Sequence, residues 1–278
     1  MALLGAAAGL VSLAVVWYVA HHTAIGRHLD ASILRGFADL TRPRLDQLTN
    51  FIAKLCDPRP YVFLAAAPVV VALVRHRPRV AVMIAVVLLC ANETTELLKP
   101  LLVGPRDPVQ WVPIDTASWP SGHATAAMSL ALCAIIAAPA RWRPAVAASM
   151  AAFAIAVSYS FLELGWHYPS DVLGGFLVAA TWTLLGVAGL SIFESRRAGG
   201  IAEVAPARRP SFSVAEALAP AAAVMAVAGI LVGQVVVAHP HEVLDYVRYH
   251  RAFVIGASAI GALGMLLASG LTVMLRRP

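Results

Sequence analysis

The sequence predicts an all-α protein that crosses a membrane many times, because of its composition and the spacing of its apolar residues. Hydrophobic residues make up 60% of the 278 residues, and charged residues make up only 13%. About a quarter of the residues of an ordinary soluble domain are charged. The apolar residues stand in long blocks between short polar segments, and a membrane-spanning helix needs about 20 such residues. A polytopic bundle of membrane helices accounts for both observations.

Eight apolar blocks are expected to form membrane spans. They are Ala2–Ala20, Tyr61–Val74, Val80–Leu98, Ala124–Ala138, Ala145–Leu162, Val172–Phe193, Ala219–Ala238 and Ala252–Leu275. We divide the chain into a six-span core over residues 1–194, a cytoplasmic basic linker over 195–218 and a C-terminal two-span hairpin over 219–278. Residues 27–55 alternate apolar and charged side chains at helical spacing, which predicts an amphipathic segment along the membrane interface.

The positive charge of the chain, a net +6, lies mainly in loops between the apolar blocks. This placement is typical of residues that set membrane topology, so we do not expect nucleic acid as a partner. Compact basic loops occupy residues 75–79, 141–143, 196–209 and 276–277. With these loops inside, the loops 99–119 and 163–170 face outward. We therefore expect an integral protein of a bacterial plasma membrane whose outward loops face the periplasmic side.

Three polar clusters interrupt the apolar pattern on this outward face. The first runs from Lys99 to Asp107, the second is Pro120-Ser121-Gly122-His123, and the third runs from Ser160 to Asp171. Each stands at the end of a predicted span. Helices that alternate in direction bring all three to one side of the membrane, so we expect them to form one site.

The first two clusters have the chemistry of a phosphate site. Ser121 occupies an N-cap position, and the free N–H groups of the following helical turn attract anions. Gly122 lets a ligand approach these N–H groups closely. Lys99 and Arg106 supply positive charge for a phosphate dianion.

The third cluster has the chemistry of a nucleophile. His167 precedes Pro169, a residue type that favours the first turn of a helix. Asp171 is four residues beyond His167, so the two side chains can share a hydrogen bond that fixes the imidazole and leaves its other nitrogen free to attack. His123 is placed to protonate a leaving oxygen. This chemistry needs no metal, and we expect neither a metal nor another cofactor.

These clusters resemble the three signature motifs of the type-2 phosphatidic acid phosphatase superfamily, over roughly Val80 to Phe193. The family pattern is Lys, six residues, Arg-Pro; Pro-Ser-Gly-His; and Ser-Arg, five residues, His, three residues, Asp. The resemblance implies hydrolysis of a lipid phosphomonoester or diphosphate, polyprenyl or glycerolipid, through a phosphohistidine. It implies that His167 is the nucleophile, Asp171 its partner and His123 the general acid. The phosphate-binding residues that it implies are Lys99, Arg106, Ser121 and Gly122.

Two positions depart from the family pattern. Asp107 stands where the family has proline, and Phe161 stands where it has a phosphate-binding arginine. Arg59 or Arg42 from the first long loop is a candidate to replace that arginine. Two alternatives stay open. One is a lipid phosphotransferase, in which His167 passes the phosphoryl group to an acceptor other than water. The other, suggested by the lost charge, is a catalytically weak protein that binds or transports a lipid phosphate. The sequence indicates no oligomeric state and does not choose the lipid.

Overall fold

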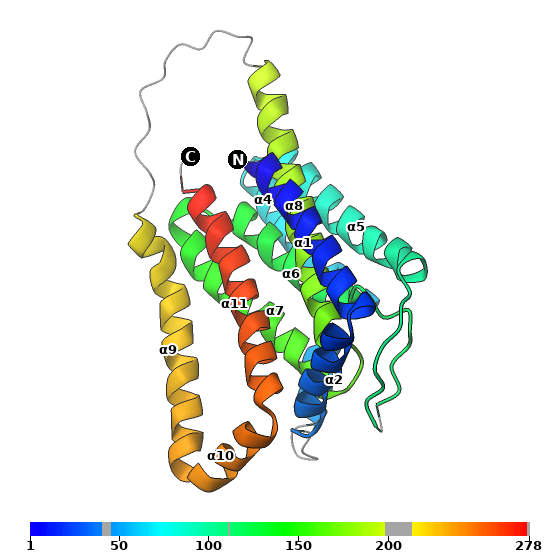
Figure 1. Cartoon of the computed structure of the whole chain (residues 1–278). Helices are drawn as coiled ribbons and strands as arrows, with labels where there is room; N and C mark the ends of the chain where they lie inside the picture. Colours follow the sequence, from blue (N-terminus) through cyan, green and yellow to red (C-terminus); the bar gives the residue numbers. More distant parts are fainter. Residues whose placement is uncertain (41–45, 111, 198–212, 277–278) are drawn as a thin grey trace.

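A computed structural model describes residues 1–40, 46–110, 112–197 and 213–276, which form a bundle of helices (Figure 1). The α-helices are α1 (Ala2–His22), α2 (Ala24–Ala38), α3 (Asp46–Lys54), α4 (Pro58–Val74), α5 (Pro78–Leu101), α6 (Gly122–Ala137), α7 (Arg143–Glu163), α8 (Pro169–Arg197), α9 (Val214–Ala238), α10 (Pro240–Tyr249) and α11 (Arg251–Met274). A short 3-10 helix, Ala140–Trp142, precedes α7. No strand occurs in the described ranges, and the predicted all-α membrane bundle is confirmed.

Six stretches among the described residues are long and apolar enough to cross a membrane. They are α1, α5, α8, α9, α11 and the continuous stretch Ala140–Glu163 that contains α7. Two of the eight predicted spans differ. Helix α6 has only 16 residues, and α4 has 17 and is bent by 58° from α3 at the break between them. If α3 and α4 count as one bent span, the total is seven.

The short helix α6 is the centre of the bundle. It packs against α4, α5, α7, α8 and α11, and nearly all its residues are buried. The two helices approach closely at the first turn of α6, where a Cβ atom added to Gly175 would lie 2.7 Å from the backbone oxygen of Ser121. A larger residue cannot occupy position 175 without moving one helix, so this glycine fixes the start of α6 against α8.

The predicted amphipathic segment forms two helices. In α2 the buried apolar residues include Ile33, Leu34 and Phe37, and the helix packs against α1, α7, α8 and α11. Helix α3 packs against α7. Residues 41–45, which include Arg42, lie outside the described residues. The location of α2 and α3 at a membrane interface stays a prediction.

The C-terminal hairpin consists of two unlike helices joined by α10, a helix that was not predicted. Helix α11 packs into the bundle: Cβ atoms added to Gly256 and Gly264 would lie 2.4 Å from Ile33 and 3.0 Å from Ile155. Helix α9 instead exposes most of its apolar side chains. The predicted linker lies largely at positions 198–212, outside the described residues, and the division into core and hairpin stays a prediction.

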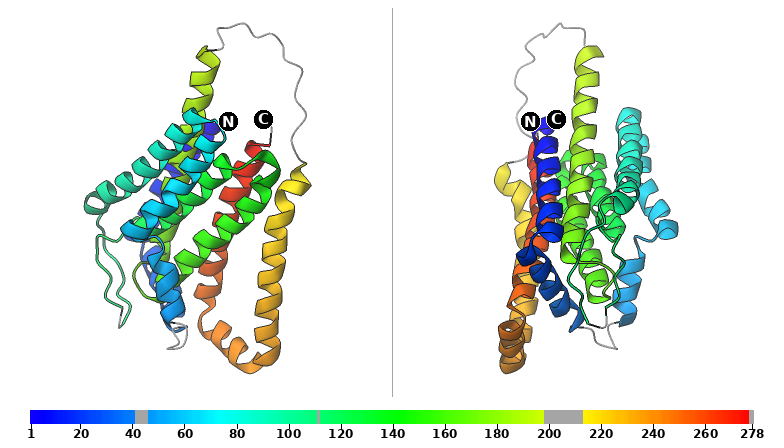
Figure 2. Two further views of the ribbon diagram at one scale, coloured as in Figure 1. Left: turned by 180° about the vertical axis from the view of Figure 1, so that it is seen from behind. Right: turned by 45° about the vertical axis from the view of Figure 1, so that its right-hand side comes forward.

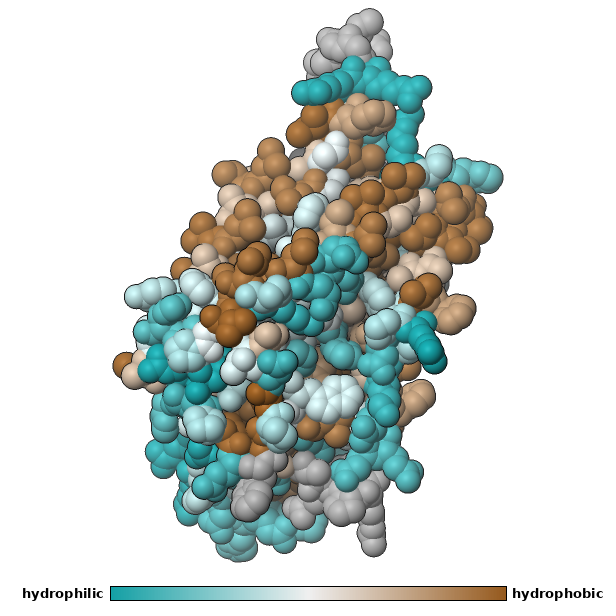
Figure 3. Space-filling model, turned by 90° about the vertical axis from the view of Figure 1, so that its right-hand side faces the viewer, coloured by the Kyte–Doolittle hydropathy of each residue, from teal (hydrophilic) through white to brown (hydrophobic). Residues whose placement is uncertain are grey.

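The two ends of the bundle differ in composition. Both termini lie at one end, together with the basic turns before α5 and α7 (Figures 1 and 2). The loop residues 102–110 and 112–121 and the turn between α7 and α8 lie toward the other end. On the face shown in Figure 3, apolar side chains dominate the half nearer the termini and polar side chains the half with the loops. The polar clusters of the sequence therefore lie on one side of an apolar band.

Candidate active site

The three polar clusters meet where α5 ends and where α6 and α8 begin. The ring centroids of His123 and His167 are 6.3 Å apart. The backbone N–H of Ser121 donates a hydrogen bond of 3.0 Å to the backbone oxygen of Asp171. The second and third clusters are thus joined directly, as the alternating topology predicts.

The start of α6 has the geometry of a capped helix. Ser121 Oγ accepts a hydrogen bond of 3.2 Å from the N–H of Ala124, which confirms the predicted N-cap. A Cβ atom on Gly122 would lie 3.1 Å from Glu96 Oε1 and 3.6 Å from Lys99 Nζ. Glycine therefore keeps the first turn of α6 close to the ammonium group of Lys99. Phosphate binding here by Ser121, Gly122 and Lys99 stays a prediction.

His167 is held by a buried carboxylate. Its Nδ1 lies 3.3 Å from Asp171 Oδ2, and the same oxygen accepts a 3.0 Å hydrogen bond from the N–H of Tyr168. The Asp171 side chain is 0% exposed. Because Nδ1 faces this carboxylate, Nε2 is the nitrogen available to a substrate.

Arg106 braces this carboxylate. Its guanidinium donates to Asp171 Oδ1, to Asp30 Oδ2 at 2.7 Å and to Ser170 Oγ at 2.8 Å. It lies 4.7 Å above the ring of Tyr168, and its side chain is only 5% exposed. These contacts direct Arg106 toward carboxylates, and its predicted contact with phosphate stays a prediction.

Asp30 is a member of this network that the sequence did not reveal. It comes from α2 and accepts hydrogen bonds from the N–H of Ser170 at 2.9 Å and from Ser170 Oγ at 2.7 Å. It therefore caps the first turn of α8, the helix that carries Asp171. Complete burial raises the pKa of Asp30 to about 6, although Arg106 acts in the opposite direction.

Two further ion pairs surround the histidines. Lys99 Nζ lies 2.6 Å from Glu96 Oε1, three residues earlier on α5. His123 Nε2 lies 2.9 Å from Asp57 Oδ1, a carboxylate at the start of α4 that the sequence did not reveal either. Each basic group of the three clusters thus has a carboxylate partner in the structure.

Phe161 fills the place that the family pattern gives to arginine. Its side chain is fully buried, and its ring centroid lies 5.2 Å from that of His167 and 6.0 Å from that of His123. Of the candidate replacements, Arg59 is exposed and lines neither cavity described below, and Arg42 lies outside the described residues. The apolar ring of Phe161 therefore packs beside both histidine rings.

Two cavities open beside the histidines. A groove of about 520 Å³ between α4, α5 and α6 has a mostly apolar lining. A smaller cavity of about 410 Å³ is lined by His167, Ser118 and Trp166, among others. Glu96 and Lys99 line both cavities. Their position gives one polar site continuous with an apolar groove, which suits a lipid with a charged head.

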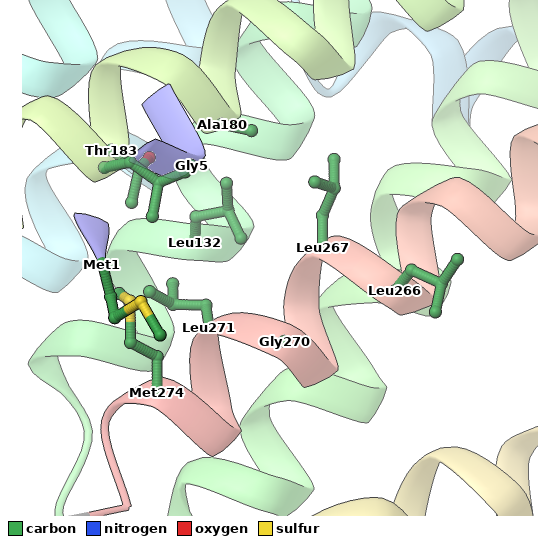
Figure 4. A pocket seen from close by; sticks show the side chains of 11 residues that line it. Met1, Gly5, Leu132, Ala180, Thr183, Leu266, Leu267, Gly270, Leu271 and Met274 are labelled. Atoms are coloured by element: carbon green, nitrogen blue, oxygen red, sulfur yellow. The ribbon is translucent and has the colours of Figure 1, made fainter. Parts of the chain in front are cut away.

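A cavity of about 210 Å³ near the N-terminus offers a contrast (Figure 4). Its lining includes Met1, Leu132, Leu271 and Met274, and no charged residue lies among the side chains that form it. The cavity therefore lacks the groups that phosphate chemistry requires.

Trp119 is a buried residue that contacts the start of α8. Its side chain is 1% exposed, and its Nε1 donates a 3.2 Å hydrogen bond to the backbone oxygen of Ser170. A Cβ atom on Gly174 would lie 2.9 Å from its ring. Trp119 therefore packs against the start of α8 and helps to position it.

Comparison with known proteins bears on the family and the fold of the chain. The sequence model of the PAP2 superfamily matches residues 55–192, a range that contains all three clusters. The bundle is similar to the crystal structure of "the first transmembrane PAP2 type phosphatidylglycerolphosphate phosphatase from Bacillus subtilis", with a TM-score of 0.55 and 19% identity over 68% of this chain and 96% of that chain. Identity at this level shows the fold alone. The search of curated proteins finds no match.

Proposed function

Since the chain belongs to the PAP2 superfamily, we propose that it is an integral membrane lipid phosphatase that works through a phosphohistidine on His167. The observation that carries this proposal is the geometry of the two histidines. Their rings lie 6.3 Å apart, beside Lys99 and at the end of an apolar groove. A phosphorus atom between the rings has a nucleophile on one side and a proton donor on the other.

In the first step, His167 Nε2 attacks phosphorus and the bond from phosphorus to the leaving oxygen breaks. The imidazolium of His123 gives its proton to that oxygen, which leaves as the lipid alcohol or lipid phosphate. The positive charge that forms on His167 is stabilised by Asp171 through Nδ1. Arg106 and Asp30 hold Asp171 in place from the side away from the histidine.

In the second step, water attacks phosphorus and the bond between phosphorus and Nε2 breaks. His123, now neutral, accepts a proton from the water and regains the form needed for the next cycle. His167 returns to neutral imidazole and inorganic phosphate leaves. We propose that both steps use side chains alone, without a metal or cofactor.

The phosphate oxygens are proposed to contact Lys99 and the N–H groups at the start of α6. Helix N-termini bind anions through their free N–H groups and their partial positive charge. A bound phosphate competes with Glu96 for Lys99, since that carboxylate lies 2.6 Å from the ammonium group. Arg106 is a weaker candidate for direct contact because it is already bound to Asp30 and Asp171.

The substrate is proposed to be a glycerolipid or polyprenyl phosphate or diphosphate. The groove of about 520 Å³ is lined by Tyr61, Val62, Leu88 and Leu89, among others, beside His123. Val62 and Leu89 are exposed on the outer surface of the bundle, so an alkyl or isoprenoid chain can enter sideways from the membrane. The similar protein from Bacillus subtilis is a phosphatidylglycerolphosphate phosphatase, which supports the glycerolipid choice.

The site is proposed to face the outside of a bacterial plasma membrane. Arginines gather at the end of the bundle opposite the site, where Arg75 donates to the backbone oxygen of Ala137 at 2.7 Å and Arg77 to that of Ile136 at 3.4 Å. Basic residues next to span ends favour the cytoplasmic side. The same arginines stabilise the C-terminal end of α6.

A second candidate function is phosphotransfer, or binding of a lipid phosphate with little turnover. It is favoured by Phe161, which replaces a cation, and by the occupied guanidinium of Arg106. A site with fewer cations holds phosphate less tightly. In the phosphotransfer alternative, His167 passes the phosphoryl group to an acceptor other than water.

The test is phosphate release by the purified protein in detergent, with a chelator present. Polyprenyl and glycerolipid phosphates and diphosphates are compared, and His167→Ala serves as the inactive variant. His250→Ala is the matched control, because His250 is a buried histidine paired with Asp39 outside the site. Release by the wild type and the control that vanishes in His167→Ala supports the proposal. Phosphate that appears only on an added alcohol indicates phosphotransfer, and no release from any lipid indicates a binding protein.

A further inference from the structure

Asp57 occupies a position where the side chain of aspartate normally caps the helix that follows it. It is the N-cap of α4, with extended backbone angles of φ −61° and ψ 151°. An N-cap carboxylate usually accepts hydrogen bonds from the N–H groups two or three residues later. Within the described helix α4, the Asp57 side chain makes no such bond.

The sequence Asp57-Pro58-Arg59-Pro60 explains why this carboxylate is available. Proline has no N–H group, so Pro60 cannot donate at the third position of the helix and only Arg59 remains as a capping donor. Proline at the first position also starts the helix without help from the cap, because its φ angle already suits a helix. The start of α4 therefore has few backbone N–H groups that need a hydrogen bond from the Asp57 side chain.

The free carboxylate turns to His123 instead. Asp57 Oδ1 lies 2.9 Å from His123 Nε2, and the exposed fractions of the two side chains are 40% and 25%. The ring of His123 is also confined by Trp166, at 5.7 Å between centroids, and by Phe161. The aromatic rings limit its position, and the carboxylate determines which nitrogen remains free.

We propose that Asp57 is the positioning residue of the general acid: it holds His123 through Nε2, directs Nδ1 to the leaving oxygen and favours the protonated ring. This inference rests on the proposed phosphatase function and extends it to a residue outside the three signature motifs. In the first step Asp57 keeps its charge while the proton on Nδ1 moves to the leaving oxygen. In the second step it steadies the same ring as Nδ1 takes a proton from water.

Other charged groups lie near His123. Glu93, Glu96 and Lys99 on α5 line the same groove, and the ring of His167 lies 6.3 Å away between centroids. Burial lowers the pKa of His123, and the charges of His167 and Lys99 lower it further, whereas the hydrogen bond with Asp57 raises it. Lys99 is paired with Glu96 at 2.6 Å, and Asp171 is shared by Arg106 and His167. Asp57 is therefore the carboxylate that contacts His123 directly, and its removal destabilises the imidazolium.

The test compares Asp57→Asn with the wild type on two soluble substrates, an alkyl phosphate and an aryl phosphate of high acidity. An alkyl leaving oxygen needs a proton, whereas the aryl leaving group departs as an anion. We expect Asp57→Asn to lower kcat/KM for the alkyl phosphate about tenfold and for the aryl phosphate by less than about twofold. Because the imidazolium is less stable in the variant, the alkaline limb of the pH profile should move to lower pH by about one unit.

Asp39→Asn is the matched control. Asp39 Oδ2 lies 3.3 Å from His250 Nε2 and its side chain is 52% exposed, so the substitution removes an equivalent carboxylate from a histidine pair outside the site. It should change neither the substrate ratio nor the pH limb. Asp57→Glu, which keeps the charge, should restore the alkaline limb at least in part.

The outcomes separate the two proposals. If Asp57→Asn loses kcat/KM equally on both substrates with an unchanged alkaline limb, or loses none, the role of Asp57 is overturned. The phosphatase function still stands in that case, provided that the wild type is active. A wild type that releases no phosphate from any substrate overturns the phosphatase function and this inference with it. A selective loss on the alkyl phosphate together with a shifted limb supports both.

Discussion

The two histidines of the site differ in how firmly the protein holds them. The partner of His167 is Asp171, which is 0% exposed and bound to Arg106 within a network that reaches Asp30. The partner of His123 is Asp57, which is 40% exposed and belongs to no larger network in the described part of the chain. One histidine is braced by buried charges, and the other is held by one carboxylate at the mouth of a groove.

This difference matches the two chemical roles. A nucleophile must keep one tautomer and one orientation, and buried hydrogen bonds provide this because alternatives leave charges without partners. A general acid and base must gain and lose a proton in every cycle, which is easier beside water. In the proposed mechanism, the same pair of residue types, histidine and aspartate, serves either role according to its burial.

The largest expected effect is that of His167→Ala, which removes the histidine whose aspartate partner is buried and bound to Arg106. Loss of the nucleophile should lower turnover about 10⁴-fold or more on alkyl and aryl phosphates alike, because no bond to phosphorus can form. Vanadate should still bind, since Lys99 and the start of α6 remain. Turnover close to the wild-type value would remove His167 from the nucleophile role.

His123→Ala should have the next largest effect, and the effect should depend on the leaving group. We expect a loss of about 10²–10³-fold on alkyl phosphates and a smaller loss on aryl phosphates in the first step. The phosphoenzyme should accumulate because water lacks a base in the second step. Burst kinetics with an aryl phosphate measure this directly, and a variant without a burst on either substrate would contradict the division of roles.

Asp30→Asn tests the buried brace through stability. The pKa of Asp30 in the folded protein is about 6, above its ordinary value of 3.8, so folding favours the protonated carboxyl. Its contribution to the free energy of unfolding is therefore greatest below about pH 4 and falls as pH rises through 6, by roughly 1–3 kcal/mol. The advantage in Tm of the wild type over Asp30→Asn should shrink over this range.

Asp39→Asn, at the C-cap of α2 and half-exposed, is the control for that measurement. Its Tm difference from the wild type should change much less between pH 4 and pH 6. If the two variants behave alike, Asp30 titrates as a surface carboxylate and the contrast between the two histidine sites disappears.

Phe161→Arg should have the smallest effect. It tests whether a positive charge beside the two histidine rings strengthens phosphate binding. A guanidinium between His123 and His167 adds a charged donor for phosphate, so we expect vanadate to inhibit at about tenfold lower concentration. Phe161→Met, which changes the ring without adding charge, is the matched control. Unchanged inhibition by vanadate would mean that another cation already contacts the phosphate.

Much of the bundle could be predicted because membrane helices reveal themselves by length and composition. The exceptions have physical reasons. Helix α6 is shorter than a membrane span. It can be short because other helices surround it, so its ends need not reach the lipid headgroups. The packing of α11 depends on Gly256 and Gly264 meeting side chains far away in sequence, and a single sequence does not show such contacts.

The chemistry of the site was less predictable than its position. The motif residues come together as expected because they stand at the ends of neighbouring helices. Asp30 and Asp57 did not stand out, since their partners lie 140 and 66 residues away. Asp57 did leave a local signal, an N-cap aspartate followed by Pro58 and Pro60, which removes a capping donor. Asp30 left none beyond a charged position on an amphipathic helix.

Transfer of phosphorus through His167 is tested most directly by trapping the phosphoenzyme. The wild type, His123→Ala and His167→Ala are mixed with a radiolabelled phosphate ester and quenched in alkali, where phosphohistidine survives, and the labelled peptide is identified by mass spectrometry. We predict label on His167 in the wild type, more label in His123→Ala and none in His167→Ala. Label on another residue, or hydrolysis by His167→Ala at the wild-type rate, would contradict a phosphohistidine on His167.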